Sequence, residues 1–282
     1  MASKVTGNTA GLKASMLRLA ERIYRRRVRT HDVVSPELAT QLCDFSRETG
    51  RQIGVLLGRR GSPEHVFVGD ANRLWLPEFG RLRAGRGRLR GLRLVHTHVR
   101  GEPLTNDDLT DLALLRLDLV AAITFKAEGQ APRIQCAHLL PETGPEPWRV
   151  LEPVSIHEND LDPVELVRSL EEEFARQSSA QEAGDGERAV LVHVATKAAK
   201  RDTEAHVSEL RELCRTAGVA VVDTVTQRRE RPDPRYAIGR GKLEEVVLRA
   251  NQLGAELLIF DPDLTPAQAR ALADATELKV ID

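Results

Sequence analysis

The sequence predicts an α/β protein with two domains, and three observations support this fold class. At 282 residues the chain is long enough for two domains. Short apolar runs alternate with helical segments towards the C-terminus, as in small parallel sheets covered by helices on both faces. Proline and acidic residues are enriched between these regions. We therefore expect a basic N-terminal helix or arm (1–34), a mixed α/β domain (35–140), an acidic linker with a helix (141–187) and a small parallel-sheet α/β domain (188–282).

The first domain is expected to open with helices and continue with strands. Residues 1–34 contain a basic helical segment, and Ser35 followed by Pro36 is typical of a helix start. Apolar runs bounded by turn residues predict strands. We expect strands at 52–57, 65–68, 92–96, 119–125 and 133–137, and a helix at about 106–115.

The second domain is expected to alternate strands and helices. Valine-rich runs at 189–194 and 219–224 flank a helix near 203–216, and an apolar run at 257–260 predicts a buried strand. Thr265, Pro266 and Gln268 form a helix-start pattern. Such sheets bind ligands at the carboxyl ends of their strands. The polar or small residues at or near those ends are His193, Ala195, Asp223 and Asp261.

Composition excludes several classes of protein. The longest apolar run, 119–125, is far too short to span a bilayer, and the first fifteen residues lack the apolar core of a secretory signal. Cys43, Cys136 and Cys214 are scattered, which argues against a disulfide or zinc-ribbon framework and fits a reducing compartment. We expect a cytoplasmic protein without a membrane segment.

The distribution of charge predicts a polyanion partner for the first part of the chain. Residues 1–100 hold 20 Lys and Arg against 8 Asp and Glu, whereas the remainder holds 21 against 34, so the net charges are +12 and −13. Guanidinium groups bind phosphates well. A solvated basic loop, or pairing with the acidic second half, is the alternative. The candidate RNA-binding residues are Arg25, Arg26, Arg27, Arg83, Arg86, Arg88 and Arg90.

A glycine-rich turn at Gly239, Gly241 and Lys242 is a candidate phosphate-binding site, because it leads into a predicted helix N-terminus. The alternative is a helix-start turn packed against the sheet. The turn is not a P-loop, since Tyr236 stands where the first glycine belongs and Leu243 follows the lysine. Asp-x-x-Gly and Asn-Lys-x-Asp are also absent. We therefore expect no GTP hydrolysis by this chain alone.

A second candidate site contains two histidines and an aspartate. In a strand, His96 and His98 point to the same face, and Asp108 on the following helix could complete a three-ligand metal site for zinc. In the alternative interpretation, Thr105 and Asp108 form a helix capping box and the histidines are only hydrogen-bonded.

The same segment resembles the His-x-His and Ser/Thr-x-x-Asp pattern of JAMM-type metalloproteases. Its spacing from His98 to Thr105 is one residue shorter than in that pattern. The resemblance also implies a catalytic glutamate before the strand at 54–58, and Arg51 stands there. A guanidinium cannot act as a general base. A metal-dependent hydrolase of JAMM-like type is therefore kept as an alternative function, expected to be degenerate.

The last 48 residues resemble the N-terminal domain of the HflX family of ribosome-associated GTPases. The shared motifs are Gly239-Arg240-Gly241-Lys242 with two glutamates, Phe260-Asp261, and Leu264-Thr265-Pro266 with Gln268. Extended members of that family are also similar to the first domain, including its His-Thr-His stretch. The resemblance implies binding to the large ribosomal subunit or its RNA, and a GTPase domain in cis that uses GTP and Mg²⁺.

In that family a helical arm and the GTPase domain follow the segment that ends here at Asp282, so we expect this chain to be the family's N-terminal region without its catalytic part. Three hypotheses follow from the sequence. They are a ribosome- or RNA-binding and regulatory region, a metal-dependent hydrolase, and a nucleotide-binding module.

Overall fold

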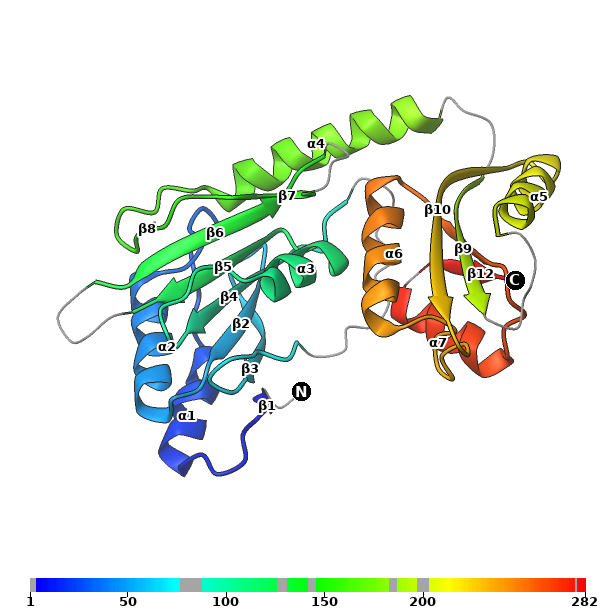
Figure 1. Cartoon of the computed structure of the whole chain (residues 1–282). Coiled ribbons are helices and arrows are strands. Elements are labelled where there is room, and N and C mark those ends of the chain that lie inside the picture. The colour runs from blue at the N-terminus through cyan, green and yellow to red at the C-terminus, as the bar shows by residue number, and fades with distance from the viewer. Residues whose placement is uncertain are drawn as a thin grey trace. The chain divides into compact units, whose positions relative to one another are not determined.

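The computed structural model describes residues 4–76, 88–125, 131–141, 146–182, 187–196, 203–276 and 278–282, in two compact α/β units (Figure 1). The first unit reaches to Phe174, and the second runs from Ala175 to Asp282. The predicted fold class of two α/β domains is confirmed. Among the described residues, no helix combines the length and the apolar character that a membrane span needs.

The first unit is built on one mixed sheet in the order β1-β3-β2-β4-β5-β6-β7, with β8 also paired to β6. The pairs β1–β3 and β4–β5 are parallel, and the other pairs are antiparallel. The strands are β1 (Thr6–Gly7), β2 (Ile53–Gly58), β3 (Pro63–Val68), β4 (Leu92–His98), β5 (Leu119–Thr124), β6 (Arg133–Leu139), β7 (Trp148–Val150) and β8 (Val154–Ser155). The helices are α1 (Ala14–Ile23), α2 (Pro36–Thr49), α3 (Asn106–Leu114) and α4 (Pro163–Glu182), of which the part up to Phe174 belongs to this unit.

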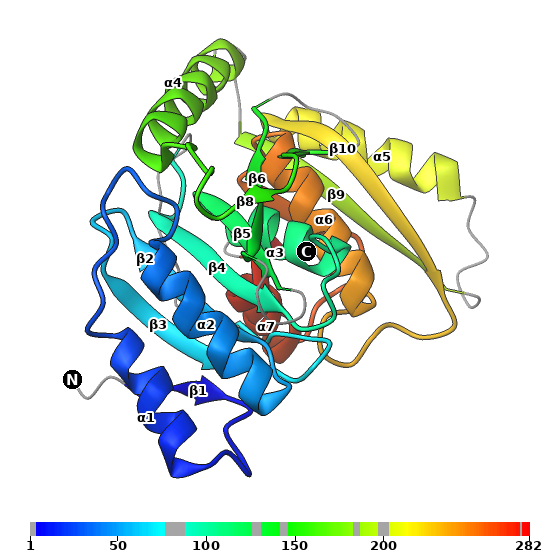
Figure 2. The same cartoon turned by 90° about the vertical axis from the view of Figure 1, so that its left-hand side faces the viewer.

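Helices α1 and α2 cover one face of this sheet, and α3 lies on the opposite face (Figures 1 and 2). Helix α2 starts as its sequence predicts, because the Ser35 side chain accepts a hydrogen bond from the Leu38 amide and Pro36 occupies the first turn. Its buried side chains, among them Phe45, share one apolar cluster with Val55 of β2 and Val95 of β4. The face towards α3 carries the polar groups described below.

The first unit extends beyond the boundaries that the sequence suggests. In the N-terminal segment, β1 pairs with β3, and Ile23 of α1 is fully buried in the core. In the proline- and acid-rich segment, β7 and β8 both pair with β6. Glu171 of α4 binds Arg59 and the Leu89 amide. Two- and three-residue edge strands are too short to show a period-2 pattern, so composition alone suggests a linker there.

The second unit is a four-stranded, wholly parallel sheet in the order β10-β9-β11-β12. Helix α5 lies on one face, and α6 and α7 lie on the other (Figure 1). The chain goes from β9 to β10 on one side and then returns to β11 on the other side of β9. The direction in which successive strands are added to the sheet therefore reverses between β9 and β11. Its elements are β9 (Glu187–Thr196), α5 (Thr203–Thr216), β10 (Val219–Arg229), α6 (Arg240–Gln252), β11 (Leu257–Phe260), α7 (Pro266–Thr276) and β12 (Lys279–Ile281).

Candidate metal centre

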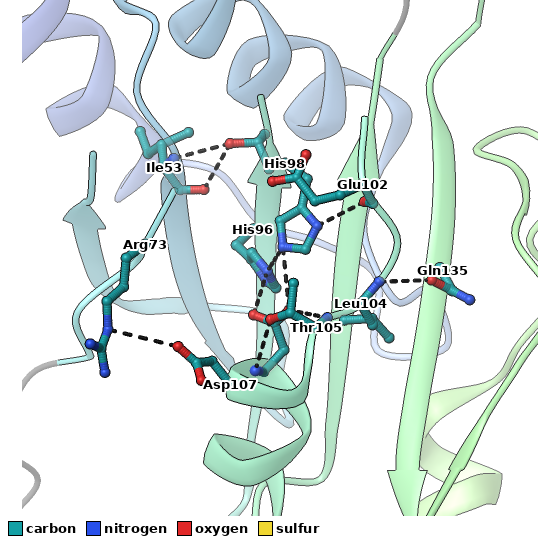
Figure 3. Close-up of polar contacts among 11 residues, drawn as sticks. Ile53, Arg73, His96, His98, Glu102, Leu104, Thr105, Asp107 and Gln135 are labelled. Atoms are coloured by element: carbon teal, nitrogen blue, oxygen red, sulfur yellow. Dashed lines mark hydrogen bonds and ion pairs between the residues drawn. The ribbon is translucent and has the colours of Figure 1, made fainter. Parts of the chain in front are cut away.

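The two histidines of β4 point to the face of the first sheet that α3 covers (Figure 3). His96 and His98 are fully or almost fully buried. Between them, Thr97 points to the other face, where its hydroxyl lies 2.7 Å from that of Ser46 and accepts a hydrogen bond from the Ile53 amide at 3.0 Å. Side-chain alternation along β4 therefore brings both imidazoles together, as the sequence predicts.

Helix α3 supplies the carboxylate through its capping box. The amide and the hydroxyl of Thr105 both donate to Asp108 Oδ2 at 2.7 Å, while the Thr105 hydroxyl accepts from the Asp108 amide at 3.4 Å. The preceding loop is held by a hydrogen bond of 2.9 Å from the Leu104 amide to Gln135 of β6. This arrangement holds the Asp108 side chain over the end of β4.

Three potential ligand atoms converge at this point. Asp108 Oδ1 lies 3.1 Å from His96 Nε2, and Asp108 Oδ2 lies 3.4 Å from His98 Nε2. The two Nε2 atoms are 2.9 Å apart. Capping box and histidine cluster therefore share one carboxylate, so the two interpretations of the sequence motif are compatible.

The backbone determines how His98 can act. Its Nδ1 donates to the carbonyl oxygen of Glu102 at 2.9 Å, which leaves Nε2 facing His96 and Asp108. Zinc-bound histidines commonly use their second nitrogen in this way. His96 differs, because its buried Nδ1 has no hydrogen-bond partner among the described residues. His98 thus has the orientation of a metal ligand, whereas His96 lacks a second contact of this kind.

The electrostatics of the cluster favour a charged Asp108. Burial opposes ionisation of this carboxyl group, but the charge of His96 and hydrogen bonds from both histidines outweigh it and lower the pKa of Asp108. Burial also opposes the charged form of His98, yet its contacts with Asp108 and Glu102 raise the pKa of His98. Two imidazole nitrogens and one carboxylate oxygen are a donor set that suits Zn²⁺.

Arg51 does not provide the group that hydrolysis would need. Its guanidinium donates to the main-chain oxygen of Asn8 at 2.6 Å, which ties the start of β2 to the N-terminal segment. A guanidinium accepts no proton at neutral pH. Where the JAMM-like pattern has a catalytic glutamate, this chain therefore has an arginine that makes a structural contact.

The candidate RNA-binding arginines differ in exposure. Arg25, Arg27 and Arg88 are exposed. Arg26 is exposed too, although its Nε donates to Gln41 at 3.1 Å. Arg90 is only 9% exposed and donates from Nε to the Leu115 carbonyl at 2.6 Å, so this guanidinium is occupied within the fold. Arg83 and Arg86 lie outside the described residues.

The glycine-rich turn of the second unit leads into α6, as the sequence predicts. Gly239 has a φ of −68°, so it does not use the conformational freedom of glycine; the positive φ of 61° is at Ala237. The Gly239 amide donates to Gln227 at 2.9 Å, and Lys242 Nζ lies 2.6 Å from Glu245. Gly241 is exposed in the first turn of α6. These contacts account for the turn as a helix start.

Of the residues that the sequence places near strand ends in the second unit, His193 and Asp261 meet, and a residue that the sequence did not indicate joins them. His206 of α5 lies 2.6 Å from the Asp261 carboxylate. Helical periodicity predicts α5 correctly, but it does not show which residue of the helix faces a neighbouring strand end. The signal in the sequence that could have suggested this contact is the position of His206, close to the start of the helix that follows β9.

The two units together define a two-domain α/β protein whose second unit has the doubly wound parallel sheet of many ligand-binding domains. Residues 204–282 match the family described as GTP-binding GTPase N-terminal. The second unit is therefore similar to the N-terminal region of HflX-type GTPases, which confirms the predicted resemblance for this part of the chain.

Similar proteins include three named GTPase HflX. Those of Lacrimispora saccharolytica and Escherichia coli K12 are 43% and 39% identical over 96 and 97 residues, each covering 34% of this chain and 22% of the relative. That of Caldanaerobacter subterraneus subsp. tengcongensis is 36% identical over 100 residues, covering 36% of this chain and 23% of the relative. The match thus spans less than a quarter of each relative.

Proposed function

We propose that this chain acts as a ribosome- or RNA-binding and regulatory region of an HflX-type GTPase. The observation that carries the proposal is the match of residues 204–282 to the N-terminal domain of that family. The similar proteins are named GTPases, so a GTPase domain in cis would bind GTP and Mg²⁺. The resemblance to HflX proteins implies the large ribosomal subunit as partner and the cytoplasm as location.

The basic N-terminal segment supports a polyanion partner. Arg25 and Arg27 are exposed directly after α1, and Arg29 is exposed beyond the buried Val28. This alternation holds the segment on the fold through Val28 while its arginines face solvent. Guanidinium groups held on a folded scaffold lose less freedom when they bind phosphates than a free tail would.

We expect the full chain to co-sediment with 50S ribosomal particles at low salt and to be released as salt is raised, since phosphate contacts release counterions. An Arg25→Glu/Arg27→Glu variant should bind more weakly, with the slope of log K against log salt reduced by about one for each lost phosphate contact. The control is Arg231→Glu/Arg270→Glu, which changes the net charge equally at two exposed arginines of the second unit. Absence of co-sedimentation at the lowest salt contradicts the proposal. Equal weakening by both variants would assign binding to net charge rather than to this segment.

A second candidate function is metal binding of JAMM-like type at His96, His98 and Asp108. Their converging ligand atoms and the hydrogen bond from His98 to Glu102 support it. Arg51 argues against hydrolysis, so the candidate is a metal centre that stabilises the first unit. In this role the ion would replace direct contacts among the three side chains and hold α3 to the end of β4.

For this candidate we expect the purified full chain to bind zinc in a manner that depends on His98. His98→Ala should remove one equivalent, because it deletes the ligand whose orientation the backbone fixes. His157→Ala, at an exposed histidine outside the cluster, should leave the metal content unchanged. Elemental analysis after dialysis decides the question. A His98-dependent difference below about a tenth of an equivalent contradicts a metal centre there.

A further inference from the structure

A second cluster of potential metal ligands lies in the second unit, on three different elements. His193 lies on β9, His206 lies in the first turns of α5, and Asp261 directly follows β11. The potential ligand atoms of the three side chains all lie within 4.8 Å of one another. None of these residues belongs to the cluster at His96 or to the glycine-rich turn.

The Asp261 carboxylate lies between the two imidazoles. Its Oδ2 is 2.6 Å from His193 Nδ1, and its Oδ1 is 2.6 Å from His206 Nε2. The ring centres of the two histidines are 5.8 Å apart. The His193 side chain is 7% exposed, that of Asp261 13% and that of His206 23%, so the cluster is largely buried.

The topology of the sheet accounts for this placement. β9 and β11 are adjacent and parallel, and the Asp261 amide extends their ladder with a hydrogen bond of 3.0 Å to the Val192 carbonyl. Asp261 is thereby fixed beside His193. The sheet order reverses between these two strands, and open α/β sheets bind ligands outside the carboxyl ends of the strands at such a point. The cluster therefore occupies the ligand-binding position of this fold.

We propose that His193, His206 and Asp261 bind a divalent transition-metal ion of the zinc type. Two imidazole nitrogens and one carboxylate oxygen suit Zn²⁺ better than Mg²⁺ or Ca²⁺, which prefer oxygen ligands. Three protein ligands leave one position of a tetrahedral ion for water or a further ligand.

The surroundings of His206 support this assignment. Its Nε2 faces Asp261, while its other nitrogen, Nδ1, is buried and has no hydrogen-bond partner among the described residues. The nearest carboxylate to that nitrogen in the described ion pairs is Glu209, one turn further along α5, with Oε2 3.8 Å away. When a metal binds Nε2, the proton of the neutral imidazole is on Nδ1. A small rotation of the Glu209 side chain would let its carboxylate accept a hydrogen bond from this N–H, as carboxylates do for zinc-bound histidines.

The test compares matched pairs of full-length variants, so that it does not depend on the cluster at His96. Each protein is freed of metal with a chelator, titrated with Zn²⁺ and analysed for bound metal after dialysis. His206→Ala should lose one equivalent of zinc relative to wild type, and His98→Ala/His206→Ala should lose one relative to His98→Ala. His98→Ala/His157→Ala should bind as much as His98→Ala.

Two further variants separate metal binding from a purely hydrogen-bonded cluster. Asp261→Asn should remove the same equivalent, and Glu209→Gln should keep it but weaken zinc binding by about 10-fold, the lower end of the effect of a second-sphere partner. Circular dichroism establishes that each variant is folded. Equal zinc content in folded His206→Ala and its parent, in both backgrounds, would overturn the proposal. Loss of co-sedimentation with ribosomes bears only on the proposed function and leaves this result untouched.

Discussion

Replacing Phe260 by alanine is expected to lower the free energy of unfolding of the second unit by about 3–5 kcal/mol. Phe260 is 1% exposed and ends β11, which pairs with β9 on one side and β12 on the other. Truncation removes a large apolar surface from an inner strand and leaves a cavity that a parallel sheet cannot easily close. Because domains are stable by only about 5–15 kcal/mol, the loss is a large share of the total.

Urea unfolding monitored by circular dichroism measures the effect, and hydrogen exchange with mass spectrometry locates it. Peptides from residues 187–282 should lose protection, while peptides covering α2 and β2 should keep it, since Phe260 belongs to the second unit. The control Phe260→Leu keeps most of the volume and should cost less than about 1.5 kcal/mol. A loss below about 1 kcal/mol for Phe260→Ala would mean that the side chain is not packed as described.

The same substitution links the packing of the sheet to the proposed zinc site. Asp261 follows Phe260 directly and is held by the main-chain hydrogen bond to Val192. A β11 strand that moves to fill the cavity would displace this carboxylate from His193. We therefore expect weaker zinc binding in Phe260→Ala than in Phe260→Leu, although neither variant removes a ligand.

Local sequence patterns predicted those features that local geometry determines. Two histidines separated by one residue must share a face of a strand, and Asp108 three residues after Thr105 is a capping pattern, so His96, His98 and Asp108 could be brought together from sequence. Alternating apolar runs and helical segments likewise predicted the parallel second sheet, which the structure confirms. In these cases each pattern that was used lies within one turn, one strand or one helix.

Features that depend on contacts between distant segments could not be obtained in this way. His206 meets Asp261 only because α5 packs against β10 and β9, near the strand end that Asp261 follows, and no spacing in the sequence expresses this. Arg90 belongs to a run of arginines that suggests solvent exposure, but its guanidinium is held by a carbonyl 25 residues away. β7 and β8 are recognisable only through their pairing with β6. Composition describes the average environment of a segment, whereas tertiary packing decides the position of each side chain.

Replacing Gly61 by alanine is expected to destabilise the first unit by about 3–4 kcal/mol, through backbone strain and a lost hydrogen bond. Gly61 lies in the turn between β2 and β3 with a φ of +75°, and a Cβ at this position would lie 1.9 Å from the main-chain oxygen of Val28. The Val28 amide donates to the Gly61 carbonyl at 3.0 Å. The turn and the basic segment are therefore in backbone contact, and neither side can move aside by changing a rotamer.

The matched control is Gly101→Ala, because Gly101 has a similar φ of +73° but a Cβ at that position would meet no atom within 4 Å. It should cost only about 1 kcal/mol, the strain of a left-handed alanine. Thermal or urea unfolding of both variants separates the clash from the strain, and equal losses would show that the contact with Val28 contributes nothing. If the exposed arginines around Val28 bind rRNA, Gly61→Ala should also weaken co-sedimentation with 50S particles at temperatures where the variant is still folded, whereas Gly101→Ala should not. The comparison thereby tests whether phosphate binding requires the arginines to be held on the fold, or only their charge.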